Sequence, residues 1–238
     1  GDVYKRQAGH SSAEESVKQA FQKAMSDAQA ALDAATTAEA IQEATQALQT
    51  ACETYVLSAE PETGYPFDYT FLMNDSNNSD NGGSKNVTEG NIQNFTYKNS
   101  AEKNNGDLQK TGFMEAWDGK NYTATITYTR NELPNGHYKV SAYAFTTVNG
   151  NTSFTSNDKE VKMDNSTALF TNPTIEDVIV DEGKLTVGLN TTDANWTGIT
   201  NIQLQYLSKL TDAEASAKAK EALHAKLEEA GSMDTETN

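Results

Sequence analysis

The chain has 238 residues, of which 36% are hydrophobic, so one large or two modest domains with a sizeable core are possible. Its 34 acidic against 18 basic side chains give a formal net charge of −16. That balance argues against binding to nucleic acid or to anionic membrane surfaces, because both need clustered Lys and Arg. The single cysteine excludes an internal disulfide framework and a multi-cysteine metal site, and no apolar run is long enough to span a bilayer.

The first seven residues look foreign to the sequence that follows them. Gly1–Gln7 resemble translated sequencing-adapter read-through, which recurs at the ends of fragmentary metagenomic reading frames. We therefore expect residues 1–10 to be non-native or disordered. We also expect the chain to be a piece of a longer protein with neighbouring domains.

Residues 11–60 are predicted to form a helical hairpin. Ser12-x-x-Glu15 and Thr36-x-x-Glu39 have the pattern of a capping box, which marks the start of a helix. Apolar residues at helical spacing follow each box in Ala-rich sequence, namely Val17, Phe21, Met25, Ala28 and Leu32, then Ile41, Leu48, Cys52 and Tyr55. Cys52 lies on this apolar face, where a buried small hydrophobe is expected rather than a nucleophile.

Residues 65–208 consist of short alternating runs separated by Asn, Gly, Asp and Ser. The predicted strands are Phe67–Asn74, Gly112–Trp117, Tyr122–Arg130, Tyr138–Val148, Glu160–Met163, Thr174–Val180, Lys184–Leu189 and Ile202–Leu207. The clearest is Tyr122–Arg130, whose Ala124, Ile126 and Tyr128 alternate with threonines and predict one buried face. Many short strands without intervening helices indicate an antiparallel sandwich or jelly roll.

The longest polar stretch follows the first predicted strand. Asn74–Gly83 is rich in side-chain oxygens of the kind that bind Ca²⁺, but the spacing does not fit an EF-hand loop. A solvated loop is the expected reading, and a structural calcium ion is an open alternative. No other cofactor is predicted.

A third helix is predicted after the strands. Thr211-x-x-Glu214 is a capping box, the apolar spacing continues through Leu223 and Leu227, and Gly231 suits the end of a helix. This helix over 211–231 either packs on the hairpin as a three-helix bundle or starts a next module. Residues 232–238 are expected to be a disordered tail.

Several segments, in order and spacing, resemble a galactose-binding-like jelly-roll domain. They are Met114–Trp117, Leu133–Tyr138, Ala142–Phe145, Ala168–Phe170, Gly183–Leu189, and Trp196 followed by Ile202–Leu207. The resemblance extends to the carbohydrate-binding-module-like domains of Bacteroidetes surface or secreted polysaccharide-utilisation proteins, which commonly have small helical modules beside them. It implies an α+β multidomain chain, with an antiparallel β-sandwich of the jelly-roll type flanked by the Ala-rich hairpin and a C-terminal helix. One departure is Thr200–Ile202, where such domains often have Asp-Asn-Phe.

The function that this resemblance implies is non-catalytic carbohydrate binding, by an accessory module of a secreted or cell-surface bacterial protein. Sugar recognition needs flat apolar rings that stack on pyranose C–H faces, with a few polar groups to orient the hydroxyls. The candidate ligand-binding residues are Trp117, Glu115, Asp118 and Asn121. The alternative for Trp117 is a core position, and Trp196 is expected to serve packing.

No catalytic or metal-binding residue is predicted. His10, His137 and His224 are far apart in sequence, and nothing places two of them together as a metal pair or proton relay. The alternative function is a ligand-free structural spacer or protein-interaction module. Exposure of Trp117 would favour the glycan-binding function, and burial of every ring would favour the spacer. Two facing carboxylates in a cleft would instead indicate a glycosidase.

Overall fold

The computed structural model describes residues 11–34, 37–73, 88–93, 95–98, 113–147, 152–166 and 169–235. The helices are α2 (Glu15–Ala34), α3 (Ala38–Ser58), α4 (Thr70–Met73) and α5 (Asp212–Thr235). The strands are β1 (Ser11–Ser12), β2 (Glu60–Pro61), β3 (Phe67–Asp68), β4 (Thr88–Gln93), β5 (Thr96–Lys98), β6 (Phe113–Arg130), β7 (Gly136–Thr146), β8 (Ser153–Ser156), β9 (Lys159–Lys162), β10 (Thr174–Val180) and β11 (Leu185–Lys209). Residues 1–10 and the Asn74–Gly83 loop considered for calcium lie outside the described residues.

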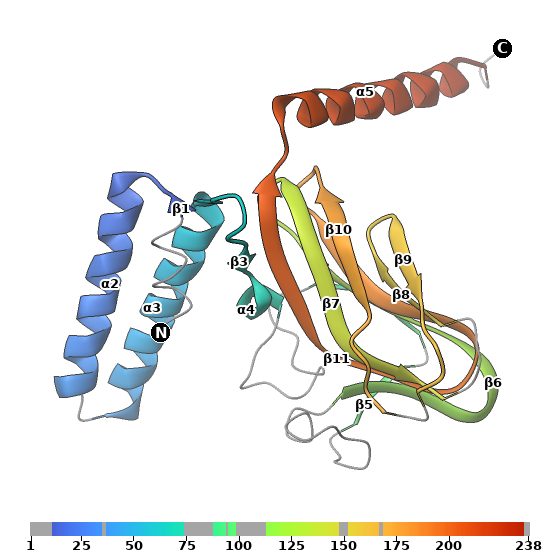
Figure 1. The fold of residues 1–238 in the computed structure, drawn as a ribbon, viewed down its shortest axis with the longest axis horizontal. Helices are drawn as coiled ribbons and strands as arrows, with labels where there is room; N and C mark the ends of the chain where they lie inside the picture. The colour runs from blue at the N-terminus through green and yellow to red at the C-terminus, as the bar shows by residue number, and fades with distance from the viewer. Residues whose placement is uncertain are drawn as a thin grey trace.

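The strands from β3 to β11 form an antiparallel β-sandwich, with two long bent strands shared by both layers (Figure 1). The second half of β11 pairs with β7, and β7 pairs with β10. This half of β11 also pairs with the first part of β6 near its start and with β3 near its C-terminal end. The first half of β11 pairs with β8 on one side and with the second half of β6 on the other, and β6 continues to β4. The predicted α+β fold, a β-sandwich with flanking helices, is confirmed.

Several predicted strand boundaries are wrong, because polar stretches that look like turns lie inside continuous strands. The predicted strands at residues 112–117 and 122–130 both fall on the single strand β6, which begins at Phe113, and those at residues 184–189 and 202–207 both fall on β11, which begins at Leu185. The pairing of β6 with β11 shifts register on both sides of Ala194, which indicates irregular positions that let paired strands bend without ending.

The first predicted strand is also wrong beyond its second residue. Asp68 accepts a hydrogen bond from the Thr70 amide through Oδ1 at 2.9 Å, and the chain turns there into α4 instead of continuing as a strand. The short strands β4, β5 and β8 were not predicted at all.

The main core lies between the two layers and includes the face predicted from alternation. Ala124, Ile126 and Tyr128 are buried, as expected. A group of tyrosine rings fills one end of this core, with ring centroids 4.9 Å apart for Tyr138 and Tyr206 and 5.4 Å apart for Tyr69 and Tyr206. Burial raises the pKa of Tyr206 to about 12, so these rings remain neutral at physiological pH.

The hairpin of α2 and α3 is joined to the sandwich through the end of α3. Phe21 stacks on Tyr55 with ring centroids 4.9 Å apart, and both belong to the same buried cluster as the sandwich core. The buried hydroxyl of Tyr69 donates a hydrogen bond to the carbonyl of Val56. The hairpin therefore shares a hydrophobic core with the sandwich at this junction.

The three helix starts agree only in part with the capping boxes read from the sequence. Helix α2 begins at Glu15, and the Lys18 amide donates to the Glu14 carbonyl at 3.1 Å, so the cap position is Glu14, two residues beyond the predicted cap at Ser12. The cap of α3 is Thr37 rather than Thr36, with its hydroxyl accepting from the Ala40 amide at 3.3 Å. The third box, Thr211 with Glu214, is confirmed.

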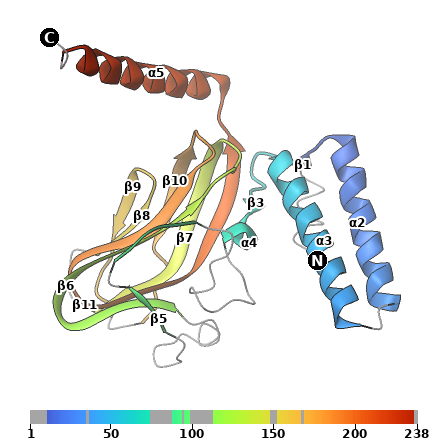
Figure 2. The same cartoon turned by 180° about the vertical axis from the view of Figure 1, so that it is seen from behind.

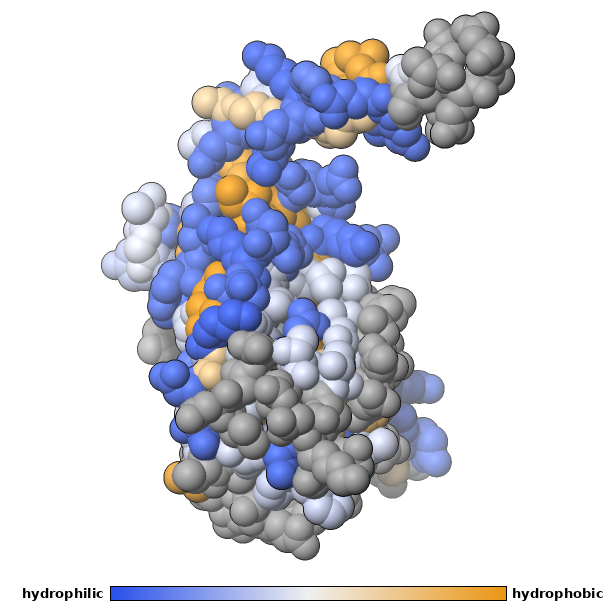
Figure 3. Space-filling view, turned by 90° about the vertical axis from the view of Figure 1, so that its right-hand side faces the viewer, coloured by the Kyte–Doolittle hydropathy of each residue, from blue (hydrophilic) through white to orange (hydrophobic). Residues whose placement is uncertain are grey.

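Helix α5 leaves the end of β11 and extends away from α2 and α3 (Figures 1 and 2). The described residues therefore contain no three-helix bundle. The helix passes through Gly231 to Thr235, beyond its predicted end, so the first part of the expected tail is helical. Figure 3 shows orange, hydrophobic patches among hydrophilic residues on α5 at the top of the molecule, and Leu223 and Leu227 are 59% and 64% exposed. None of the helices in the described ranges is both long and apolar enough to cross a membrane.

Replacing Tyr69 by Phe should destabilise the chain by about 1–3 kcal/mol, because the buried Val56 carbonyl would lose its partner. Urea unfolding followed by circular dichroism measures this change. Tyr143→Phe, at a half-buried ring whose hydroxyl makes no hydrogen bond to any described residue, is the matched control and should change the free energy of unfolding by less than about 0.5 kcal/mol. Equal effects of the two substitutions would contradict the assigned role of the Tyr69 hydroxyl.

Candidate functional site

Two of the four predicted site residues lie on one face of β6, near the point where the strand bends. Met114 and Ala116 are buried in the main core, whereas Glu115 is half-buried and Trp117 is 68% exposed. Because side chains alternate along a strand, Glu115 and Trp117 share the face opposite the core. Trp117 is thus inside a strand rather than at the strand end expected from the sequence.

The other two predicted residues, Asp118 and Asn121, belong to the same strand. Their side chains lie outside the described part of the structure, so their place in the site stays a prediction.

The register of β6 against β11 places a second tryptophan beside Trp117. Trp196 is the cross-strand partner of Trp117, and Gly198 is the partner of Glu115. Directly opposed residues of an antiparallel pair project from the same face with their Cβ atoms about 4.5–5.5 Å apart. The two indoles therefore lie on one face of the sheet. We call Glu115, Trp117 and Trp196 together the tryptophan platform.

Trp196 is held in place by two different contacts. Its Nε1–H donates a hydrogen bond to Oε2 of Glu115 at 2.9 Å. Its ring packs edge-on against Phe145, with centroids 5.2 Å apart and an interplanar angle of 85°. Both contacts restrict the indole, so Trp196 is the fixed ring of the platform and Trp117 is the open one. The packing role predicted for Trp196 is present, but its bond to Glu115 was not foreseen.

Trp196 packs against a second, smaller cluster of buried aromatic residues. Phe113, Phe145 and Phe170 are buried and meet edge-to-face, with centroid separations of 5.8 Å, 5.4 Å and 5.1 Å. Edge-to-face contacts of this kind contribute about 0.5–1.5 kcal/mol each beyond the area that they bury. The Phe170 segment is fastened to β7 by the Thr171 amide, which donates to the Ala144 carbonyl at 2.8 Å.

Gly198 makes room for this cluster. A Cβ atom at this position would lie 2.6 Å from Cε1 of Phe145 and 3.0 Å from Cδ2 of Phe113. Only a glycine lets the two rings rest against the backbone of β11. The spacing of Trp196 and Gly198 on one face is the signal in the sequence that could have linked them, but the sequence does not show which rings cover the glycine.

Polar groups border the platform. Thr96 on β5 is exposed and lies opposite Glu115 in register. Thr147 follows β7 and donates hydrogen bonds to the Trp196 carbonyl from its amide at 2.9 Å and from its hydroxyl at 3.2 Å. The surface thus combines two flat apolar rings with a carboxylate and hydroxyl groups at its border.

The described residues show no metal site on the platform or elsewhere. No group of three or more His, Cys, Asp or Glu side chains is arranged to hold an ion within the described ranges. The described side chains of the platform offer aromatic rings for stacking and a carboxylate for hydrogen bonding.

The chain matches no protein-family model and no curated protein. Among solved structures, a family 61 carbohydrate-binding module in complex with β-1,4-galactotriose is 15% identical, and the match covers 58% of this chain and 97% of that one, with a TM-score of 0.42. The C-terminal family 6 module of a marine laminarinase from Zobellia galactanivorans is 16% identical, with coverages of 49% and 92% and a TM-score of 0.35. A family 6 module of Cellvibrio mixtus lichenase 5A, in complex with cellotriose, is 12% identical, with coverages of 52% and 92% and a TM-score of 0.36.

These modules are of the class that the resemblance in the sequence predicts. The ligand has to be inferred from the surface of the chain itself.

Replacing Gly198 by Ala should destabilise the chain by about 1–3 kcal/mol, because the added methyl group would push Phe145 and Phe113 out of contact with the strand. Gly231→Ala is the matched control. Its new methyl group meets nothing within 4 Å on α5, and alanine favours a helix, so stability should stay equal or rise. Thermal unfolding of both variants distinguishes them, and a neutral Gly198→Ala would contradict the packing described for the cluster.

Proposed function

We propose that this chain is a non-catalytic carbohydrate-binding module that holds a secreted or cell-surface bacterial protein near polysaccharide. The tryptophan platform is its binding surface. Trp117 is the ring that stacks on the sugar, and Trp196 extends the apolar surface beside it. The Glu115 carboxylate, which accepts the Trp196 hydrogen bond, orients a sugar hydroxyl beside the two rings.

The observation that carries this proposal is the exposure of Trp117 beside a second, immobilised indole. Full burial of a large apolar side chain contributes about 1.5–3 kcal/mol, and Trp117, at 68% exposed, leaves most of this unused. An exposed ring on a rigid strand loses little conformational freedom when it binds. Such a ring fits the flat C–H face of a pyranose, and the neighbouring carboxylate fits its hydroxyls.

The charge of the chain favours neutral glycans. A net charge of −16, with a carboxylate in the platform itself, repels uronate-rich or sulfated polysaccharides at long range. We therefore propose neutral polysaccharides as the ligand class. The same charge disfavours nucleic acid as a partner.

A second candidate function is a protein-interaction module, and one observation favours it. A hollow of about 320 Å³ between α2 and α3 is lined largely by apolar side chains, including Met25, Leu32, Ile41 and Leu48. Leu32 and Ile41 are exposed there. This surface is on the helices and leaves the tryptophan platform free, so the two functions are separable by experiment.

Replacing Trp117 by Ala should weaken glycan binding at least about tenfold, because the stacking ring is lost. A glycan array of neutral and anionic polysaccharides first identifies the ligand, and isothermal titration calorimetry then compares the variants. Stability should change by less than about 0.5 kcal/mol, since Trp117 is mostly exposed.

Tyr65→Ala is the matched control, because Tyr65 is an exposed aromatic residue away from the platform. It lies next to β3, and β3 pairs with β11 near the C-terminal end of that strand, away from Trp196. It should leave affinity unchanged. An unaltered affinity of a folded Trp117→Ala variant would remove the platform as the site. Binding to no glycan by the folded chain would favour the protein-interaction function.

A further inference from the structure

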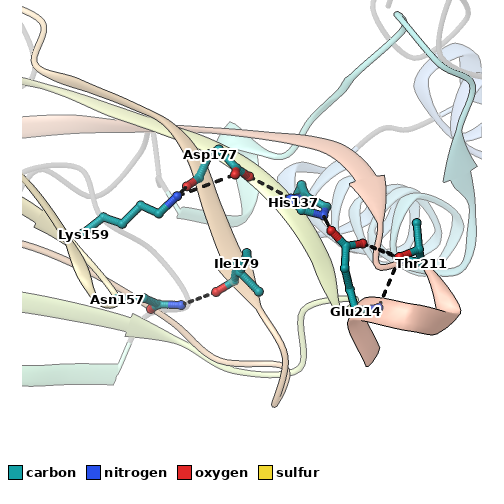
Figure 4. Close-up of polar contacts among 7 residues, drawn as sticks. All are labelled: His137, Asn157, Lys159, Asp177, Ile179, Thr211 and Glu214. Carbon is teal, nitrogen blue, oxygen red and sulfur yellow. Dashed lines mark hydrogen bonds and ion pairs between the residues drawn. The ribbon is translucent and has the colours of Figure 1, made fainter. Parts of the chain in front are cut away.

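His137 on β7 lies between two carboxylates that belong to different elements (Figure 4). Its Nδ1 is 2.8 Å from Oδ1 of Asp177 on β10, and its Nε2 is 3.2 Å from Oε1 of Glu214 on α5. The imidazole side chain is 20% exposed. One histidine thus connects the sandwich to the first turn of the C-terminal helix.

This geometry selects the protonated form of the ring. A carboxylate only accepts hydrogen bonds, and a neutral imidazole has one donor and one acceptor nitrogen. Only the imidazolium can donate to Asp177 and Glu214 at once. Burial of the ring acts to lower the pKa of His137, but the hydrogen bonds to Asp177 and Glu214 outweigh it and raise the pKa above its ordinary value.

The two carboxylate oxygens of Glu214 contact different partners, one at the cap of α5 and the other at His137. Its Oε2 accepts from the Thr211 amide at 2.8 Å and from the Thr211 hydroxyl at 2.7 Å, which closes the capping box of α5. Its Oε1 faces His137. The hydrogen bonds from Thr211, followed by that from His137, lower the pKa of Glu214 to about 2.

Beyond its first turn, α5 presents few half-buried side chains among the described residues. Apart from Glu214 and Lys218, the side chains from Asp212 to Gly231 are all exposed. Lys218 is 3.9 Å from Asp181, a distance at the limit of an ion pair, and it also pairs with Glu221 on its own helix at 3.3 Å. The direction of α5 therefore depends largely on its first turn.

Two lysines near His137 form ion pairs of their own. Lys159 on β9 lies 3.6 Å from Oδ2 of Asp177 and donates to the Asp177 carbonyl. Lys209 on β11 follows Ser208, the cross-strand partner of His137, and it pairs with Glu60 at 2.8 Å. Asp177 and Glu214 are thus the groups that respond directly to the charge of His137.

We propose that His137 is a proton-dependent latch that fixes the direction in which α5 leaves the sandwich. Below the ordinary histidine pKa of 6.5 the latch is closed, and it opens as the pH rises through the raised pKa of His137. The contribution of Glu214 is present above its ordinary pKa of 4.5 and is lost as the pH falls toward 2. The latch is therefore fully closed between pH 4.5 and 6.5, and it opens progressively as the pH rises through the raised pKa of His137 or falls toward 2.

The test is a distance measurement by pulsed EPR on the full chain, between spin labels at two exposed positions. Asn190→Cys on β11 and Ala225→Cys on α5 carry the labels, and Cys52→Ser removes the native thiol. We expect one narrow distance peak at about pH 5.5 that broadens at about pH 9. His137→Gln should give the broad distribution at both pH values, with α5 still helical by circular dichroism.

His224→Gln is the matched control, because His224 is an exposed histidine that pairs with Glu228 on the same helix, four residues along, at 3.4 Å. It should keep the wild-type response to pH. The proposal is overturned by a distance distribution that does not change between the two pH values, or by a narrow peak in His137→Gln. A titration of the His137 ring signals by NMR in the unsubstituted chain gives a second test, and a pKa at or below the ordinary value would also overturn it.

Discussion

The pairing of β6 with β11 is the constraint on which the rest of the structure depends. Both strands are long, both bend, and together they run through the two layers of the sandwich. Beyond the bend, Ala124, Ile126 and Tyr128 of β6 are buried in the core. Near the bend, after the register shifts on both sides of Ala194, the same two strands bring Trp117 opposite Trp196. A slip of one residue in either half would turn the side chains of that half to the other face, so the pairing of these two strands specifies both the core and the platform.

The platform is rigid where it meets the protein and open where it meets solvent. Glu115 and Phe145 immobilise Trp196, and Gly198 lets the aromatic cluster approach the backbone beneath it. Trp117 has no comparable enclosure, since 68% of its side chain is exposed. A binding surface built on paired strands loses little freedom when a ligand stacks on it. The His137 contacts lie at the opposite end of β7 from Phe145, so the attachment of α5 and the platform are separate features of one scaffold.

Local patterns in the sequence predict the parts of this structure that depend on neighbouring residues. Alternation predicts the buried face of β6, and the spacing of Thr211 and Glu214 predicts the cap of α5. Features that depend on long-range register were not predictable in this way. The polar residues near positions 118–121 resemble a turn, although β6 continues through them. The hydrogen bond between Glu115 and Trp196 joins residues far apart in the chain, so Glu115 could be proposed as a ligand contact but not as the residue that holds a tryptophan.

The proposed stacking of sugars on the tryptophan platform can be measured directly, because the chain has two tryptophans and both belong to the platform. A ¹H–¹⁵N spectrum contains one indole signal for each, and Trp117→Phe assigns them. During titration with a neutral oligosaccharide chosen from the array, the account predicts that the Trp117 indole signal shifts most, with a smaller shift for Trp196 and none for the amides of α5. Saturable binding of the sugar with both indole signals unmoved would contradict the account.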